Sequence, residues 1–65
     1  MNVLYINSFG KGKVIKNTTV KPSKGDSIFL GHKPLNKVET VVLHPHKSDY
    51  ESATDEHIDV MVLTD

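Results

Sequence analysis

Apolar and polar residues alternate along most of this chain, and this alternation limits the folds it can adopt. Successive side chains of a β-strand point to opposite faces, so a period of two predicts strands with one buried face. Several β-branched residues, which favour strands, strengthen the pattern. The pattern predicts five strands, over residues 3–7, 13–20, 27–30, 35–43 and 58–64. No stretch has the spacing of a convincing amphipathic helix.

Turn-forming residues separate the expected strands. Gly10 and Gly12 lie between the first two strands and can adopt the positive φ that a tight hairpin needs. Pro22 and Gly25 predict a turn before the third strand. Pro45 ends the fourth strand because proline cannot donate to the hydrogen-bond ladder. These short connections predict a five-stranded antiparallel meander, curled into a partly open SH3-like barrel.

The length and composition limit the class of protein. The chain has 65 residues, enough for one domain over residues 1–65 with a small core. It has no cysteine, which excludes a disulfide framework and thiol catalysis. It also lacks an apolar run of about 20 residues, the length that spans a bilayer. Because the N-terminus does not have the pattern of a secretion signal, we expect a cytoplasmic protein without membrane contact.

Charge is divided unequally between the two halves of the chain, although the formal net charge is zero. Residues 1–37 contain seven lysines and one acid, whereas residues 38–65 contain one lysine and seven acids. The two halves can pair within one sheet, or they can form a bipolar surface whose acidic part meets a basic partner. All basic residues are lysine, and the lack of arginine argues against sequence-specific reading of nucleic acid.

Histidines and carboxylates are the residues best suited to carry chemistry. A tetrahedral metal site could be formed by His44, His46, His57 and Asp55, but Pro45 interrupts the strand between the first two. The serines lie in turns or at strand starts without a nucleophile motif, and most carboxylates share the polar segment 46–57. We therefore expect no bound metal, no cofactor and no enzymatic activity, although metal binding by the three histidines stays open.

Two parts of the chain are the expected partner-binding sites. The segment 46–57 offers carboxylates around an aromatic residue, and the first hairpin offers lysines beside another. Tyr5 and Phe29 are expected in the core, which leaves Phe9 and Tyr50 as exposed aromatic anchors. The expected partner-binding residues are Tyr50, Asp49, Glu51, Asp55, Glu56, Phe9, Lys11 and Lys13.

Residues 21–30 and 37–42 together resemble small β-proteins encoded by phages and prophages of Gram-positive bacteria. The shared features are a first hairpin, a Pro-x-x-Gly-Asp turn and a valine-rich strand that ends in His-Pro. The resemblance implies the fold and a viral origin. Small phage proteins commonly bind and redirect host enzymes. The resemblance therefore implies a non-enzymatic protein of host takeover. Such a protein binds a host protein in the host cytoplasm and modulates or inhibits it.

A second, local resemblance is to the phage uracil-DNA glycosylase inhibitor. Residues 26–30 and 51–65 are similar to the acidic-Ser-Ile strand of that family and to its acidic loop before a Met-Leu strand. This resemblance implies DNA mimicry, with Asp26, Ser27 and Ile28 as contact residues. Binding of nucleic acid by the lysine-rich half is a further alternative. A monomer or a homodimer is compatible with each of these functions.

Overall fold

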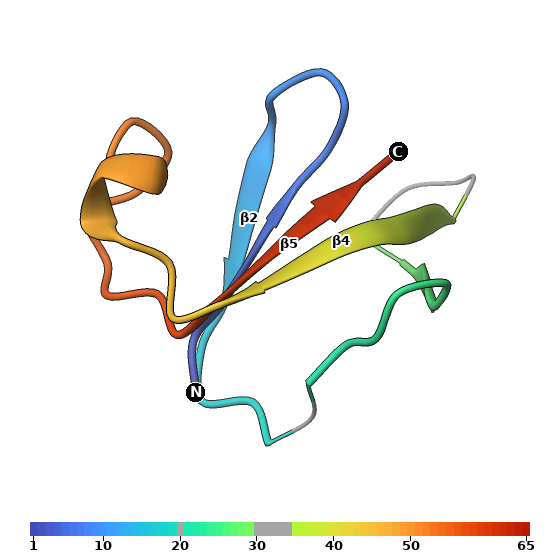
Figure 1. Cartoon of the computed structure of the whole chain (residues 1–65), viewed down its shortest axis with the longest axis horizontal. Coiled ribbons are helices and arrows are strands. Elements are labelled where there is room, and N and C mark those ends of the chain that lie inside the picture. The colour runs from blue at the N-terminus through green and yellow to red at the C-terminus, as the bar shows by residue number, and fades with distance from the viewer. Residues whose placement is uncertain (20, 30–34) are drawn as a thin grey trace.

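The computed structural model of this chain describes residues 1–19, 21–29 and 35–65. These residues form five strands and one short 3₁₀ helix. The strands are β1 (Val3–Ile6), β2 (Gly12–Ile15), β3 (Ser27–Ile28), β4 (Asn36–Leu43) and β5 (Val60–Thr64), and the helix is η1 (Lys47–Asp49). They form a curled half-barrel with almost no helix, which confirms the prediction of an all-β fold with five strands (Figure 1).

The strands are shorter than the alternation predicted. β2 ends at Ile15, whereas the expected strand covered residues 13–20. Asn17 adopts a left-handed backbone with φ of 57°, which interrupts the extended conformation. β3 is limited to two residues, and β5 begins at Val60 instead of residue 58. Residues 20 and 30, where two expected strands end, lie outside the described residues.

The order of the strands in the sheet is β2-β1-β5-β4-β3, so the prediction of an antiparallel meander is wrong. β1 forms an antiparallel hairpin with β2, and β4 is antiparallel to both β3 and β5. β1 and β5, however, lie side by side and parallel, with Val3 opposite Val60. β5 therefore enters the centre of the sheet, between β1 and β4, instead of extending it at an edge.

Two of the three interior strands, β1 and β5, share a sequence feature that explains their position. Residues 3–6 and residues 60–63 are each four consecutive apolar residues. A strand of this kind has apolar side chains on both faces, and burial of both faces requires a central place in the sheet. β2 and β3, which carry fewer apolar side chains, form the two edges.

The sheet has an apolar cluster on each face, which we name the closed face and the open face. On the closed face, the buried residues are Val3, Tyr5, Val38, Val60 and Val62. On the open face, they are Leu4, Met61, Tyr50 and Ile58, of which the last two belong to the connection between β4 and β5. The burial of Tyr5 confirms its expected place in the core. Phe29 is 59% exposed, so its expected place in the core is wrong.

Residues 18–19 and 21–26 belong to the connection between β2 and β3, and residues 21–26 run beside β4. Thr18 and Met1 exchange two backbone hydrogen bonds, of 2.9 and 3.0 Å, at the start of this segment. Pro22 is buried, and at the far end the N–H of Gly25 donates to the carbonyl of Val38 at 2.9 Å. Gly25 has a φ of +94°, a conformation that glycine adopts without steric cost, in agreement with the predicted turn.

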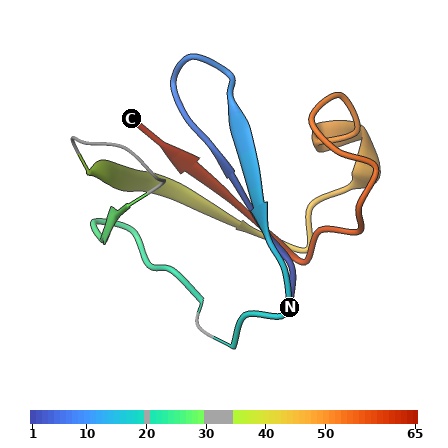
Figure 2. The ribbon, with the colours of Figure 1, turned by 180° about the vertical axis from the view of Figure 1, so that it is seen from behind.

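The connection between β4 and β5, residues 44–59, is a folded segment. Asp49 accepts the backbone N–H of His46 at 3.1 Å, and the N–H of Ala53 donates to the carbonyl of Tyr50 at 2.9 Å. Within the described residues, helical structure is confined to η1. Figures 1 and 2 show this connection at one side of the molecule and residues 21–28 at the other. No helix in the described residues is long and apolar enough to span a membrane.

Candidate functional site

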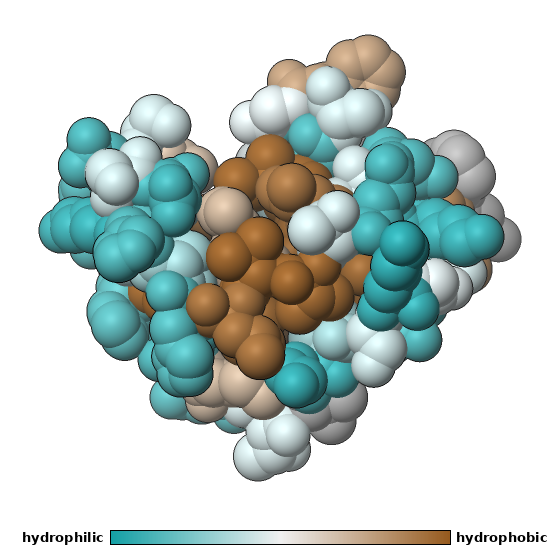
Figure 3. All heavy atoms as spheres, in the orientation of Figure 1, coloured by the Kyte–Doolittle hydropathy of each residue, from teal (hydrophilic) through white to brown (hydrophobic). Residues whose placement is uncertain are grey.

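An apolar surface is exposed on the open face. Ile6, Val14, Val42 and Leu63 pack around buried Leu4 and its neighbours, yet each of the four remains partly exposed. Among the described residues, no segment crosses over this part of the sheet. Figure 3 shows apolar atoms gathered at the centre of this face with hydrophilic atoms around them.

The open face is covered at one end only. Tyr50 and Ile58 pack there against Leu4, and Ala53 approaches β2. A Cβ added at Gly12 would lie 3.7 Å from the Cβ of Ala53 and 3.2 Å from Leu4 Cδ1. The connection between β4 and β5 therefore closes tightly over one end of the open face and leaves the other end to solvent.

Tyr50 is a core residue, so its expected role as an exposed binding anchor is wrong. Its side chain is only 3% exposed, and its hydroxyl accepts the backbone N–H of Ile58 at 3.3 Å. The physical reason lies in the composition of segment 46–57, which contains one aromatic residue among polar ones. That residue is the one with enough apolar area to hold the segment on the sheet.

The four acidic residues expected to bind a partner are all exposed, on the connection beside the apolar surface. They are Asp49, Glu51, Asp55 and Glu56. Within the described residues, the only ion pair between a lysine and a carboxylate joins Lys16 Nζ to Glu56 Oε1 at 2.8 Å. Among the described residues, charge pairing between the lysine-rich and the acid-rich half is thus limited to this one contact, which favours the bipolar alternative.

The hairpin between β1 and β2 presents Phe9 to solvent, as predicted. Phe9 is 87% exposed. The side-chain oxygen of Asn7 accepts the backbone N–H groups of Phe9 and Lys11, both at 3.0 Å, and Gly10 has a φ of +80°. Lys11 and Lys13 are exposed as well. The tip is therefore an ordered turn that displays an aromatic ring near two lysines.

The described histidines do not gather into a metal site. No group of three or more His, Asp or Glu side chains lies close enough to hold a metal ion within the described ranges. His57 Nε2 lies 3.2 Å from Asp59 Oδ1 instead. Asp59 also accepts the backbone N–H of Asn2 at 2.7 Å, and this bond and the neighbouring His57 lower the pKa of its carboxyl group.

The residues implied by the resemblance to the glycosylase inhibitor lie at the β3 edge. Asp26 accepts the backbone N–H of Ser23 at 2.8 Å and so closes the turn before β3. Ser27 is exposed, and Ile28 packs partly buried against the closed-face cluster. The pKa of the Tyr5 hydroxyl is raised, mainly by burial and to a smaller extent by the negative charge of Asp26.

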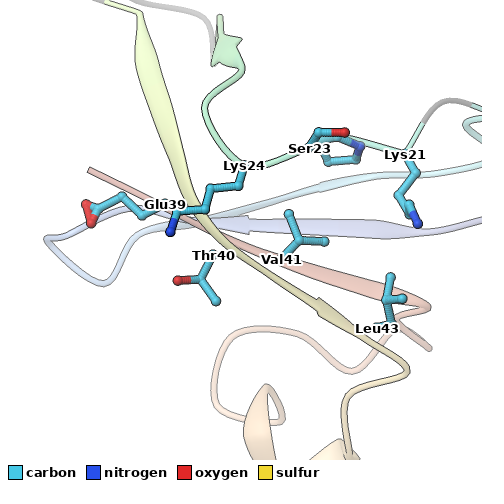
Figure 4. A pocket seen from close by; sticks show the side chains of 8 residues that line it. Lys21, Ser23, Lys24, Glu39, Thr40, Val41 and Leu43 are labelled. Carbon is cyan, nitrogen blue, oxygen red and sulfur yellow. The ribbon is translucent and has the colours of Figure 1, made fainter.

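A groove between residues 21–24 and β4 was missed by the sequence reasoning. It has a volume of about 470 Å³. Its two walls, drawn in Figure 4, consist of Lys21, Pro22, Ser23 and Lys24 on one side and of Glu39, Thr40, Val41 and Leu43 on the other. The sequence held one signal: the expected fourth strand, residues 35–43, is about twice as long as the third, residues 27–30. The third strand therefore could not pair with the fourth along its whole length.

Comparisons of the chain with models of protein families, with curated proteins and with solved structures found no match.

Proposed function

We propose that this chain is a non-enzymatic binding module that docks a protein partner on its open face. This proposal rests on the apolar surface around Ile6, Val42 and Leu63. The surface stays exposed although a domain of this size has only a small apolar core. Apolar surfaces with a polar rim mark sites of protein interaction. Burial against a partner would stabilise these side chains through the hydrophobic effect.

The charges beside this surface indicate the chemistry of the partner. The connection between β4 and β5 carries Asp49, Glu51 and Asp55, for which the described residues offer no lysine at ion-pair distance. A partner with an apolar centre and flanking lysines or arginines complements this arrangement. Phe9, on the hairpin tip, is available as a second anchor.

The target is part of the same proposal. The resemblance of residues 21–30 to small phage β-proteins supports a protein of a bacterial host, bound in the host cytoplasm, as the partner. Inhibition of uracil-DNA glycosylase and the likeness to SH3 barrels stay predictions. Nucleic-acid binding is the second candidate, because exposed Phe9 lies near Lys11 and Lys13 and could stack on a base.

A pair of matched variants tests the proposal. Leu63→Glu places a charge on the open face, whereas Leu35→Glu places the same charge at an exposed leucine outside the apolar surface. We expect tagged wild-type chain and Leu35→Glu to retain one stoichiometric host protein from lysate, and Leu63→Glu to lose it. Circular dichroism of both variants establishes that each is folded. Equal retention by the two variants, or no retained protein, would contradict the proposal.

A further inference from the structure

Within residues 1–19, 21–29 and 35–65, the outer edge of β4 has no strand partner for most of its length. β3 pairs with β4 at Asn36 and Lys37, and the preceding turn adds two backbone hydrogen bonds at Val38, of 2.9 Å from Gly25 and 2.8 Å to Asp26. Beyond Val38, the described strand partners of β4 all belong to β5, on its other side. The edge over residues 39–43 is therefore available to another strand.

The register shows which backbone groups this edge presents. The N–H of His44 donates to the carbonyl of Asp59 at 2.9 Å, so His44 faces the β5 side. Backbone groups in an antiparallel pair alternate in direction, which also turns Thr40 and Val42 toward β5. Val41 and Leu43 consequently direct their N–H and C=O groups away from β5, as two donors and two acceptors for an added strand.

A groove with a second wall accompanies this edge. Figure 4 shows Val41 and Leu43 pointing toward residues 21–24, whereas Thr40 points away. Val41 is partly exposed and Leu43 is 52% exposed, so the floor of the groove is apolar and accessible. An extended chain bound here could bury alternate side chains on this floor while its backbone pairs with β4.

The opposite edge of the sheet is different. β2 contains Lys13 and is flanked by Lys11 and Lys16. Natural sheets use lysines on edge strands in this way to prevent the addition of another strand. Residues 39–43 contain no lysine. Lys21 and Lys24 lie on the far wall of the groove, where they would face the side chains of a bound strand.

We infer that the β4 edge binds an extended acidic peptide as an additional strand. Lys21 and Lys24 line the groove, Lys37 lies at its β3 end, and Glu39 is the one carboxylate among the lining residues. Neither Lys21 nor Lys24 forms an ion pair within the described residues. This unpaired positive charge complements a peptide with acidic side chains. The site lies apart from the open face and does not depend on the function proposed for it.

Peptide selection tests this inference. The immobilised full chain is offered a pool of synthetic peptides of about six residues, the usual length of a strand, with Val and Thr alternating. Half of the pool carries two Asp residues, and the other half carries two Lys residues at the same positions. We expect the acidic peptides to be retained about tenfold better, and Lys21→Glu/Lys24→Glu to reverse this preference. Lys11→Glu/Lys13→Glu, the control at the hairpin, should leave it unchanged.

Amide hydrogen exchange of the wild-type chain gives a second measurement that requires no variant. The retained peptide should slow exchange at Val41 and Leu43 and leave Thr40 and Val42 unchanged. Failure to retain any peptide, or protection elsewhere in the sheet, would overturn the inference. Concentration-dependent protection of the same amides without peptide would assign the edge to a second copy and also overturn it. Leu63→Glu should bind the peptides like wild type, which separates this site from the open face.

Discussion

The two faces of the sheet are built by the same strands but differ in what covers them. On the closed face, Val3 and Val62 are fully buried, whereas Ile6 and Leu63 of the same two strands face the open side and stay partly exposed. Residues 21–26 run beside β4 and are joined to it by backbone hydrogen bonds at Val38, while the connection between β4 and β5 closes one end of the open face. Strand residues thus provide apolar faces, and the connections decide which face remains available for binding.

The same acidic substitution should therefore have very unequal effects on the two faces. Val62→Asp buries a charge without a partner and should lower the free energy of unfolding by about 3–5 kcal/mol. This is a large part of the total stability of so small a domain. Leu63→Asp, one residue further on, should cost about 1 kcal/mol because that side chain keeps contact with water. Urea denaturation followed by circular dichroism measures both. Similar losses for the two variants would show that the faces are equally closed.

Tyr50 tests whether the covered end of the open face depends on one anchor. Tyr50→Ala should cost about 3–5 kcal/mol through lost packing. Tyr50→Phe keeps the ring but removes the acceptor for the Ile58 N–H, and should cost about 1 kcal/mol. The free energy of unfolding from denaturant titration checks both values. Tyr50→Ala with wild-type stability would restore the interpretation of this residue as an exposed anchor.

Acid should loosen the junction between β1 and β5, where Asp59 accepts the N–H of Asn2. The pKa of Asp59 is lower in the folded state than in the unfolded state. Its contribution is therefore fully present above the unfolded-state pKa and is lost as the pH falls through the lower folded-state value. The loss should begin near pH 4 and continue below it. Denaturant titrations from neutral pH to about pH 2.5 should give a flatter acidic limb for Asp59→Asn than for wild type. Identical slopes would exclude this role.

The smallest expected effect concerns the contact between the two charged halves. Lys16 and Glu56 form an ion pair whose side chains are 53% and 46% exposed. Exposed pairs of this kind contribute about 0.2–1 kcal/mol, and salt screens them. A double-mutant cycle with Lys16→Ala and Glu56→Ala should give a coupling energy near the lower limit that vanishes at high salt. A larger, salt-independent coupling would indicate that the halves are held together electrostatically.

The sequence predicted local structure better than the arrangement of the strands. Alternation and turn residues identified the strands and the burial of Tyr5, and the exposure of Phe9 followed from its place in a glycine turn. The parallel pairing of β1 with β5 joins residues at opposite ends of the chain, and no local pattern specifies such a pair. The consecutive apolar residues of both strands were the available signal, and alternation alone gave it too little weight.

The candidate site was predicted in part. The acidic residues of segment 46–57 are exposed as expected, because charged side chains rarely find partners in so small a core. The apolar surface beside them and the groove along β4 were not predicted. Both depend on the paths of long connections, and many paths of residues 44–59 or 16–26 are compatible with the same strands.

The central claim, that the open face is the binding surface, is tested most directly by methyl NMR of the chain with the host protein it retains. We predict that the methyl signals of Ile6, Val42 and Leu63 shift or broaden on binding, while those of Val3 and Val62 do not. Changes confined to the closed face or to the hairpin tip, with the open-face methyls unaffected, would contradict the claim.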